Sequence, residues 1–223
     1  MQKCLAIISL CLISGQAIAG AGMHMPDKIH KVAVKHFEVL TDDTALVHLE
    51  GWYGDELRKT TWSAEWRKTD EHENSEISLG YVWATSAFWD GGPVLSVEEE
   101  SEPGERHREH WFGWQFKGTA PYFIHTDFKT LLGEQQQFKM ELELEHEFPL
   151  SKHWLLESKL ELEGGRFADD GRHEVALESW RVGWRLQYET VARFRYYTGV
   201  EYADDEHADS QEWRFLTGLS YWW

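Results

Sequence analysis

Hydrophobic and polar residues alternate along most of the chain. Residues 138–145 are the clearest example, with apolar side chains at even positions and charged side chains at odd ones. Residues 156–163 repeat the pattern. In a strand, these two sets point to opposite faces of the sheet. On a helix they would spread around the whole circumference and leave no apolar face. The pattern therefore predicts β-strands.

About twelve segments of roughly ten residues share this alternation, and roughly ten residues is the length that a tilted strand needs to cross a bilayer. The sequence predicts an all-β fold, a closed transmembrane up-and-down antiparallel β-barrel of about 12 strands. The predicted strands are 31–40, 45–54, 58–68, 75–85, 92–100, 108–118, 121–131, 136–148, 153–164, 174–188, 192–203 and 211–223.

The connections between these segments alternate between two kinds. One set is charged or glycine-rich and comprises 42–43, 70–74, 101–106, 133–136, 164–172 and 204–210. The other set is tight or apolar and comprises 54–57, 86–92, 118–121, 149–152 and Thr190. A barrel with one end outside the cell and one end in the periplasm predicts this alternation. An even number of strands returns both termini to the periplasmic side.

Aromatic residues gather near the ends of the predicted strands, and the chain holds 13 tryptophans. Amphipathic rings at strand ends are typical of the girdles of outer-membrane barrels. A soluble β-sandwich with a large aromatic core is the alternative. The last predicted strand places Trp213, Phe215, Leu219, Tyr221 and Trp223 on one face. This ending, with Gly218 before it, resembles the C-terminal signal read by the barrel insertion machinery, although Leu216 replaces the usual polar residue.

The N-terminus has the features of an export signal. Lys3 is followed by the apolar run 5–13 and by the small-residue site 17–19, which predicts cleavage after Ala19. The run is too short to span a bilayer as a helix. Expected divisions are a cleaved signal peptide at 1–19, a short periplasmic segment at 20–30 and an outer-membrane barrel at 31–223. Cys4 and Cys11 fall in the removed piece, and Leu10 disfavours processing as a lipoprotein.

The charge balance limits the possible partners. Without Lys3, 21 basic residues face 39 acidic ones, a net charge of −18. This argues against nucleic acid and against anionic lipid surfaces as partners, and it is compatible with attraction of cations.

The polar faces of the strands would line the interior of the barrel. Its predicted acidic residues are Glu50, Glu65, Asp127, Glu141, Glu143, Glu145, Glu147, Glu157, Glu161 and Glu163. Its predicted basic residues are Lys59, Arg67, Lys129, Lys139, Lys159, Arg181, Arg185 and Arg214. A solvated, salt-bridged lumen and a cation-favouring channel both fit this composition.

Three short groups are candidate metal ligands. His48 with Glu50, and His125 with Asp127, are alternate residues that share a lumen face, and imidazole with carboxylate suits Cu(II) or Zn(II). Near the mature N-terminus, Met23, His24 and Met25 combine thioether and imidazole, which favours Cu(I). No nucleophile constellation converges in the sequence, so we expect no catalytic residues and no enzyme.

Several stretches, in order, resemble the copper resistance protein B family of outer-membrane proteins. The likeness runs from about Leu46 to the aromatic end. The stretches are 51–55 (GWYGD), 86–90 (SAFWD), 118–123 (GTAPYF), 142–145 (LELE), 148–151 (FPLS) and 197–202 (YTGVEY). Where family members often begin with a long Met- and His-rich segment, this chain has only residues 22–31 with a single Met-His-Met.

The resemblance implies a monomeric barrel that handles copper at the outer membrane of a Gram-negative bacterium. It also implies work with periplasmic copper-binding proteins in resistance to excess copper. The expected function is therefore copper binding, copper passage or both, with copper as the bound or transported ion. A general small-solute channel or structural barrel without a metal role is the alternative. A membrane-embedded hydrolase or acyltransferase is a third reading, and the sequence gives no reason to expect it.

Overall fold

The strands form one closed antiparallel sheet. The computed structural model describes residues 29–41, 43–69, 72–102, 105–134, 137–166, 176–191, 193–205 and 212–223. Each strand pairs with its neighbours in the sequence, and pairing of the first strand with the last closes the barrel. The twelve strands are β1 (Ile29–Leu40), β2 (Ala45–Gly54), β3 (Arg58–Lys68), β4 (Glu73–Ala84), β5 (Trp89–Glu102), β6 (Glu105–Ala120), β7 (Ile124–Leu132), β8 (Phe138–Pro149), β9 (Trp154–Arg166), β10 (Ala176–Val191), β11 (Phe194–Asp205) and β12 (Glu212–Trp222). The predicted fold class is confirmed.

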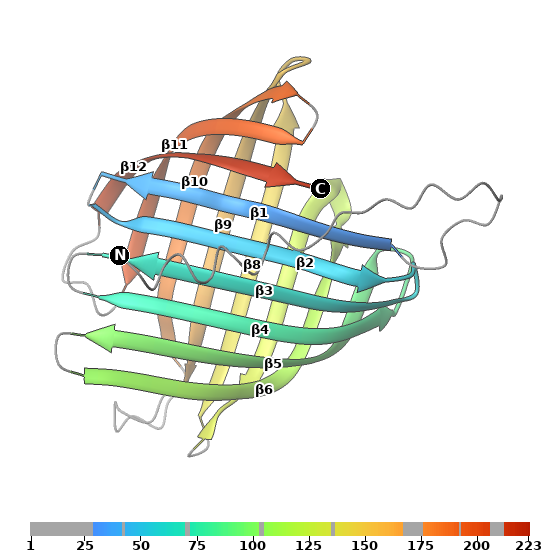
Figure 1. The fold of residues 1–223 in the computed structure, drawn as a ribbon, viewed down its shortest axis with the longest axis vertical. Helices are drawn as coiled ribbons and strands as arrows, with labels where there is room; N and C mark the ends of the chain where they lie inside the picture. Colours follow the sequence, from blue (N-terminus) through green and yellow to red (C-terminus); the bar gives the residue numbers. More distant parts are fainter. Residues whose placement is uncertain are drawn as a thin grey trace.

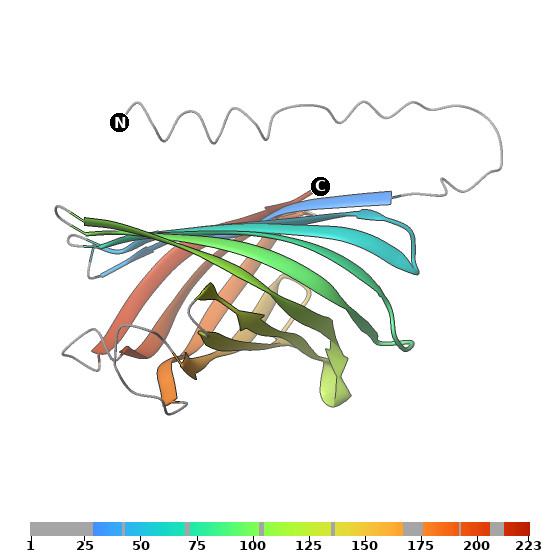
Figure 2. The ribbon, with the colours of Figure 1, turned by 90° about the horizontal axis from the view of Figure 1, so that it is seen from below.

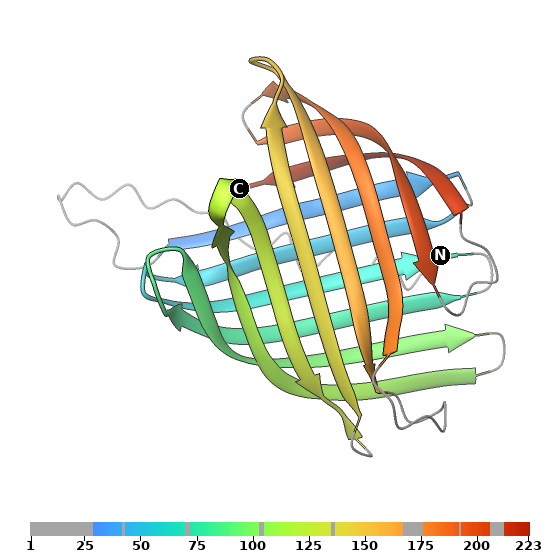
Figure 3. The ribbon, with the colours of Figure 1, turned by 180° about the vertical axis from the view of Figure 1, so that it is seen from behind.

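Strand register keeps the two kinds of side chain on opposite faces of the barrel. On β8 and β9, Glu141 lies opposite Glu163 and Leu142 lies opposite Leu162. The front strands cross the rear strands obliquely in Figures 1 and 3, and Figure 2 shows the sheet curving around a single interior. Such a tilt is what closure of a sheet into a barrel requires.

The two ends of the barrel differ in their connections. The links after β2, β4, β6, β8 and β10 lie at one end, which we name the turn end. The first and last strands also meet there, with Ala33 opposite Trp222. The remaining links lie at the opposite end, named the loop end. Both termini of the barrel are therefore at the turn end, as the even strand count predicts.

The charged connection predicted at 101–106 is shorter in the structure. Strand β5 runs to Glu102 and β6 begins at Glu105, with Ser101 paired to Arg106. Charges of opposite sign lie across these strand ends, since Arg108 forms an ion pair with Glu99 and Arg106 Nη1 lies 3.3 Å from Glu99. Opposite charges on facing strands stabilise the pairing, so a polar sequence continues the sheet here.

The predicted strand start at residue 121 is also wrong. Residues Pro121–Phe123 form a short 3-10 turn, η1, and β7 begins at Ile124. Proline lacks the N–H that a strand ladder uses. Tyr122 has a φ of 65° and Phe123 a φ of 60°, which are left-handed values incompatible with a strand.

Large apolar side chains cover the outside of the barrel. Near the turn end, the rings of Trp83 and Trp114 meet edge to face, with their centroids 5.3 Å apart. The ring centroids of Trp154 and Tyr188 lie 4.9 Å apart. An exposed apolar surface of this kind is expected of a barrel that spans a membrane. Not every aromatic residue faces outward, because Trp111 and Tyr197 are buried on the interior face.

No helix long and apolar enough to cross a membrane occurs in the part of the chain that the structure describes.

Candidate functional site

Two polar cavities occupy the interior of the barrel. The loop-end cavity has a volume of about 410 Å³ and the turn-end cavity about 640 Å³. Five residues line both cavities, namely Lys35, Glu50, Lys117, Asp127 and Glu143. The two cavities therefore adjoin each other within the barrel and share one polar boundary.

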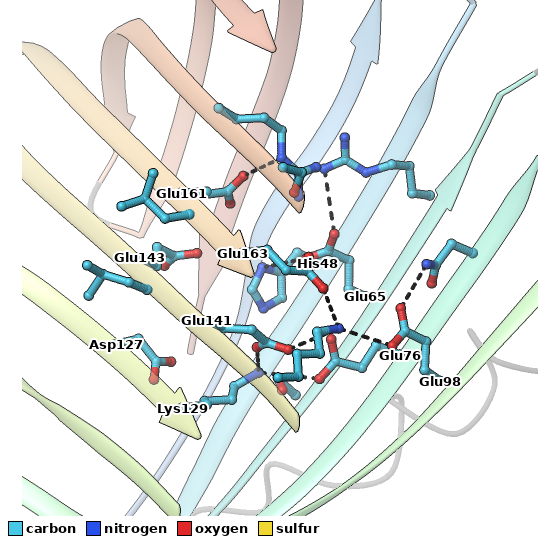
Figure 4. Close-up of a pocket in the computed structure, with 18 of the residues that line it drawn as sticks. His48, Glu65, Glu76, Glu98, Asp127, Lys129, Glu141, Glu143, Glu161 and Glu163 are labelled. Carbon is cyan, nitrogen blue, oxygen red and sulfur yellow. Dashed lines mark hydrogen bonds and ion pairs between the residues drawn. The ribbon is translucent and has the colours of Figure 1, made fainter. Parts of the chain in front are cut away.

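Acidic residues dominate the loop-end cavity, where twelve acidic and six basic side chains form the lining. Lys139 Nζ lies 3.1 Å from Glu98, 3.2 Å from Glu141 and 2.7 Å from Glu163. Figure 4 shows Lys129 pointing toward Glu76 and Glu141, at distances of 3.3 Å and 2.8 Å. Each of these lysines is surrounded by carboxylates from several strands.

The turn-end cavity has a milder acidic excess, with eight acidic and five basic side chains. Three close ion pairs hold most of its basic groups. They are Lys59 to Asp90 at 2.6 Å, Lys117 to Asp127 at 2.7 Å, and Arg195 to Glu147 at 2.5 Å. Both cavities consequently offer more carboxylates than their basic residues can neutralise.

One side of the interior is filled by a buried ion cluster. The guanidinium of Arg185 contacts Glu38 at 2.7 Å and Glu201 at 3.5 Å, and its side chain is only 2% exposed. Tyr197 packs beside it with Leu40 and Leu216. Neither Arg185 nor Glu38 lines the loop-end or the turn-end cavity, so both cavities lie beside this cluster.

A β-bulge in β1 brings two adjacent polar side chains into the interior. The pairing of β1 with β2 shifts between Val34 and His36, and the pairing with β12 shifts between Val34 and Phe37. An extra residue at a bulge places successive side chains on the same face. Lys35 and His36 accordingly both line the turn-end cavity.

Lys35 and His36 meet two carboxylates of β8 across the barrel, and we name Lys35, His36, Glu143 and Glu145 the waist. Lys35 forms an ion pair with Glu143, and its Nζ lies 3.0 Å from Glu145 Oε1. His36 Nε2 lies 3.8 Å from the same Glu145 oxygen. Strands β1 and β8 are not neighbours in the barrel, so these contacts bridge the interior.

The two predicted His and carboxylate pairs both face the interior, as their alternation suggested. His48 and Glu50 line the loop-end cavity, where His48 Nδ1 lies 3.7 Å from Glu65. His125 and Asp127 line the turn-end cavity. In both pairs the carboxylate is held by a lysine, since Glu50 lies 3.4 Å from Lys31 and Asp127 contacts Lys117.

The predicted Met23, His24 and Met25 lie outside the described residues. Within the described ranges, no three His, Asp or Glu side chains are already arranged as a metal shell.

A family model described as copper resistance protein B precursor matches residues 28–223, nearly the whole chain. The chain belongs to this copper resistance protein B family. Membership places the acidic interior in the context of copper resistance and confirms the resemblance drawn from the sequence. No curated relative matches the chain.

Solved porins share the fold of this family member. KdgM porin superposes with a TM-score of 0.54 and 11% sequence identity, covering 86% of this chain and 98% of the porin. KdgM porin in complex with disordered oligogalacturonate gives the same values. NanC porin gives a TM-score of 0.53 and 9% identity, covering 86% of this chain and 99% of that porin. These superpositions establish the shared barrel fold, and identities this low say nothing about the solute.

Sequence reasoning missed the waist histidine and its lysine in this family member. Strict alternation assigns only one of Lys35 and His36 to the interior, because it assumes an unbroken period of two. The adjacent polar pair in an otherwise alternating strand was the available signal, since a bulge lets both residues face inward.

Proposed function

We propose that this protein works in the outer membrane of a Gram-negative bacterium, where its interior binds copper ions and lets them cross. Family membership supplies the copper context. The observation that carries the proposal is the excess of carboxylates over basic groups along both adjoining cavities. A cleft lined mainly by one sign of charge, with low-dielectric walls, concentrates ions of the opposite sign.

Imidazoles along the same cavities favour copper over other cations. His48 and His107 line the loop-end cavity, and His36 and His125 line the turn-end cavity. Imidazole with carboxylate is a donor set that suits Cu(II), whereas hard cations prefer oxygen alone. We assign His48 with Glu50, and His125 with Asp127, as stations on the path, and Met23, His24 and Met25 as the segment that presents the ion.

Copper entry into liposomes tests the proposal. Purified protein is reconstituted into liposomes that enclose a copper-sensitive fluorophore. The initial rate of fluorescence quenching by added copper is compared with that of protein-free liposomes. Faster entry with protein is the expected result. The double variant Glu65→Gln/Glu109→Gln, on the interior face, should slow entry about fivefold, because each lost charge weakens cation attraction by about 0.5 kcal/mol at about 8 Å in water. The matched variant Glu73→Gln/Glu99→Gln removes two charges from the outer face and should leave the rate unchanged.

The presenting segment and the stations are tested by equilibrium binding. Replacing Met23, His24 and Met25 by alanine should lower the copper stoichiometry or affinity of purified protein. Unchanged binding removes the segment from the mechanism. His48→Ala and His125→Ala apply the same measurement to the two stations.

A general small-solute channel is the second candidate, favoured by the likeness of the fold to porins. That function predicts steady conductance in planar bilayers, indifferent to added copper, and swelling of liposomes in neutral sugars.

Deletion of the gene, followed by measurement of copper tolerance and cell copper content, gives the direction of copper movement. Co-purification with periplasmic copper-binding proteins tests the partners that the family context suggests. Transport requires no catalysis, so the protein should not hydrolyse phospholipid.

A further inference from the structure

We propose that the waist is a site for Cu(II) whose resting occupant is the ammonium of Lys35, so that a copper ion must displace a tethered cation to pass. The metal donors would be His36 Nε2 with the carboxylates of Glu143 and Glu145. This inference rests on the proposed function and adds where, and by which residues, the path selects its ion.

The orientation of His36 is fixed by the groups behind it. Its Nδ1 lies 3.3 Å from Glu38 Oε1 and 3.3 Å from the Tyr197 hydroxyl, and Arg185 holds Glu38 in turn. Donation of Nδ1–H to Glu38 leaves the lone pair on Nε2, the arrangement of a carboxylate–histidine–metal triad. His36 is 3% exposed, yet its Nε2 has no hydrogen-bond partner and points toward Glu145.

An unpartnered buried nitrogen is costly unless it has a ligand to meet. The ring of His48 lies 6.1 Å away between ring centroids, so a second imidazole stands beside the same position.

Lys35 occupies the place that a metal ion would take. Its ammonium lies between Glu143 and Glu145, contacting both across the barrel. Because the ammonium of Lys35 already stands among them, His36, Glu143 and Glu145 need not be arranged as a metal-binding shell. Within the described residues, no preformed group of three such ligands is found. Lys159 stays nearby, 3.2 Å from Glu143, but its closest carboxylate is Glu161 at 2.6 Å.

The donor set explains which cation can displace the lysine. An ammonium ion can use the two carboxylates but gains nothing from the lone pair of His36. Cu(II) binds imidazole and carboxylate together, whereas Mg²⁺ takes oxygen ligands and gives up its water reluctantly. Copper therefore gains a ligand at the waist that neither the lysine nor magnesium can use, and this difference would make the waist selective.

Release of Lys35 can be measured on the protein without any substitution at the waist. Detergent-folded protein is treated with a small water-soluble acetylating reagent, and the acetylation rate of each lysine is followed by mass spectrometry. Added Cu²⁺ should raise the rate at Lys35 severalfold, and added Mg²⁺ at the same concentration should not. Lys139, which is held by three other carboxylates, is the internal control and should not respond.

Substitutions then test the donors, all in a background with Met23, His24 and Met25 replaced by alanine. Lys35→Met removes the competing cation and should raise Cu²⁺ affinity at least about tenfold, since a positive charge at about 4 Å repels a bound cation strongly at an intermediate dielectric. Lys35→Arg keeps the charge and should keep the low affinity. His36→Gln should remove the coupling to one nitrogen from the electron paramagnetic resonance spectrum of bound copper, because His48 and His125 still supply imidazoles.

The outcomes separate this inference from the function on which it rests. The waist site is overturned if Cu²⁺ leaves the acetylation of Lys35 unchanged, or if the nitrogen coupling of bound copper is the same in His36→Gln as in the background protein. In both cases the unsubstituted protein must still carry copper into liposomes. Failure of the unsubstituted protein to carry copper instead overturns the proposed function, whatever the waist binds.

Discussion

Arg185 and Glu38 form a two-point ion pair across the interior, with Nε to Oε1 at 2.7 Å and Nη2 to Oε2 at 3.3 Å. They come from β10 and β1, which are separated in the barrel by β11 and β12. Both side chains are almost fully buried. A two-point contact of this kind fixes the geometry of both partners as well as neutralising their charges. The pair therefore links β1, which closes the barrel against β12, to β10 across the interior.

Arg185→Met should be strongly destabilising, because it leaves the carboxylates of Glu38, Glu157 and Glu201 buried without their shared cation. The expected loss is about 3–5 kcal/mol in the free energy of unfolding. Urea titration in detergent micelles, read by tryptophan fluorescence, measures it. Arg106→Met removes an exposed arginine and should change stability by less than about 0.5 kcal/mol. Equal stability of the two variants would show that the buried cluster does not hold the barrel closed.

Gly80 leaves room for a side-chain bridge between β3 and β6. Gln115 Nε2 donates to Thr61 Oγ1 at 3.1 Å, and a Cβ added at Gly80 would lie 1.8 Å from that nitrogen. Gly80→Ala should therefore break the bridge and cost about 1–3 kcal/mol, the usual range for overpacking. Gly183 also faces the interior, but an added Cβ there meets no atom closer than 3.3 Å, so Gly183→Ala should cost less. Urea midpoints compare the two variants, and a larger loss at Gly183 would contradict this account.

The barrel could be predicted from the local alternation of apolar and polar residues. The waist could not, because it depends on contacts between residues far apart in the sequence. Alternation at 138–145 gave both the strand and the inward direction of Glu143, because side-chain direction follows from the period of two. The partners of Glu143 could not be predicted in this way. Its contact with Lys35 joins residues more than a hundred positions apart, and it depends on barrel closure and on a bulge that alternation does not encode.

Lys139 is expected to limit the cation preference of the loop-end cavity. Lys139→Met leaves Glu98, Glu141 and Glu163 without a cation that contacts all three. One charge shifts the energies of K⁺ and Cl⁻ by about 0.5 kcal/mol each, in opposite directions, at about 8 Å in water. The potassium-to-chloride permeability ratio should therefore rise about fivefold. Reversal potentials across planar bilayers under a KCl gradient give this ratio. Lys152→Met at the exposed β8–β9 turn is the control, and a rise in both variants would mean that net charge alone sets the selectivity.

The outward face of the barrel is expected to lie in lipid, with Leu95 near the middle of the bilayer and Leu177 near its edge. Leu95 is 56% exposed in the middle of β5, and Leu177 is 58% exposed at the loop end of β10. An arginine on the lipid face costs about 2–4 kcal/mol at the midplane and about 0–1 kcal/mol near the interface. Leu95→Arg should therefore lower the free energy of unfolding from lipid vesicles by more than Leu177→Arg. Because the two leucines are equally exposed, a soluble protein would tolerate both substitutions alike. Equal effects would thus contradict the placement of this face in a membrane, and with it the assignment of the carboxylates to a water-filled path.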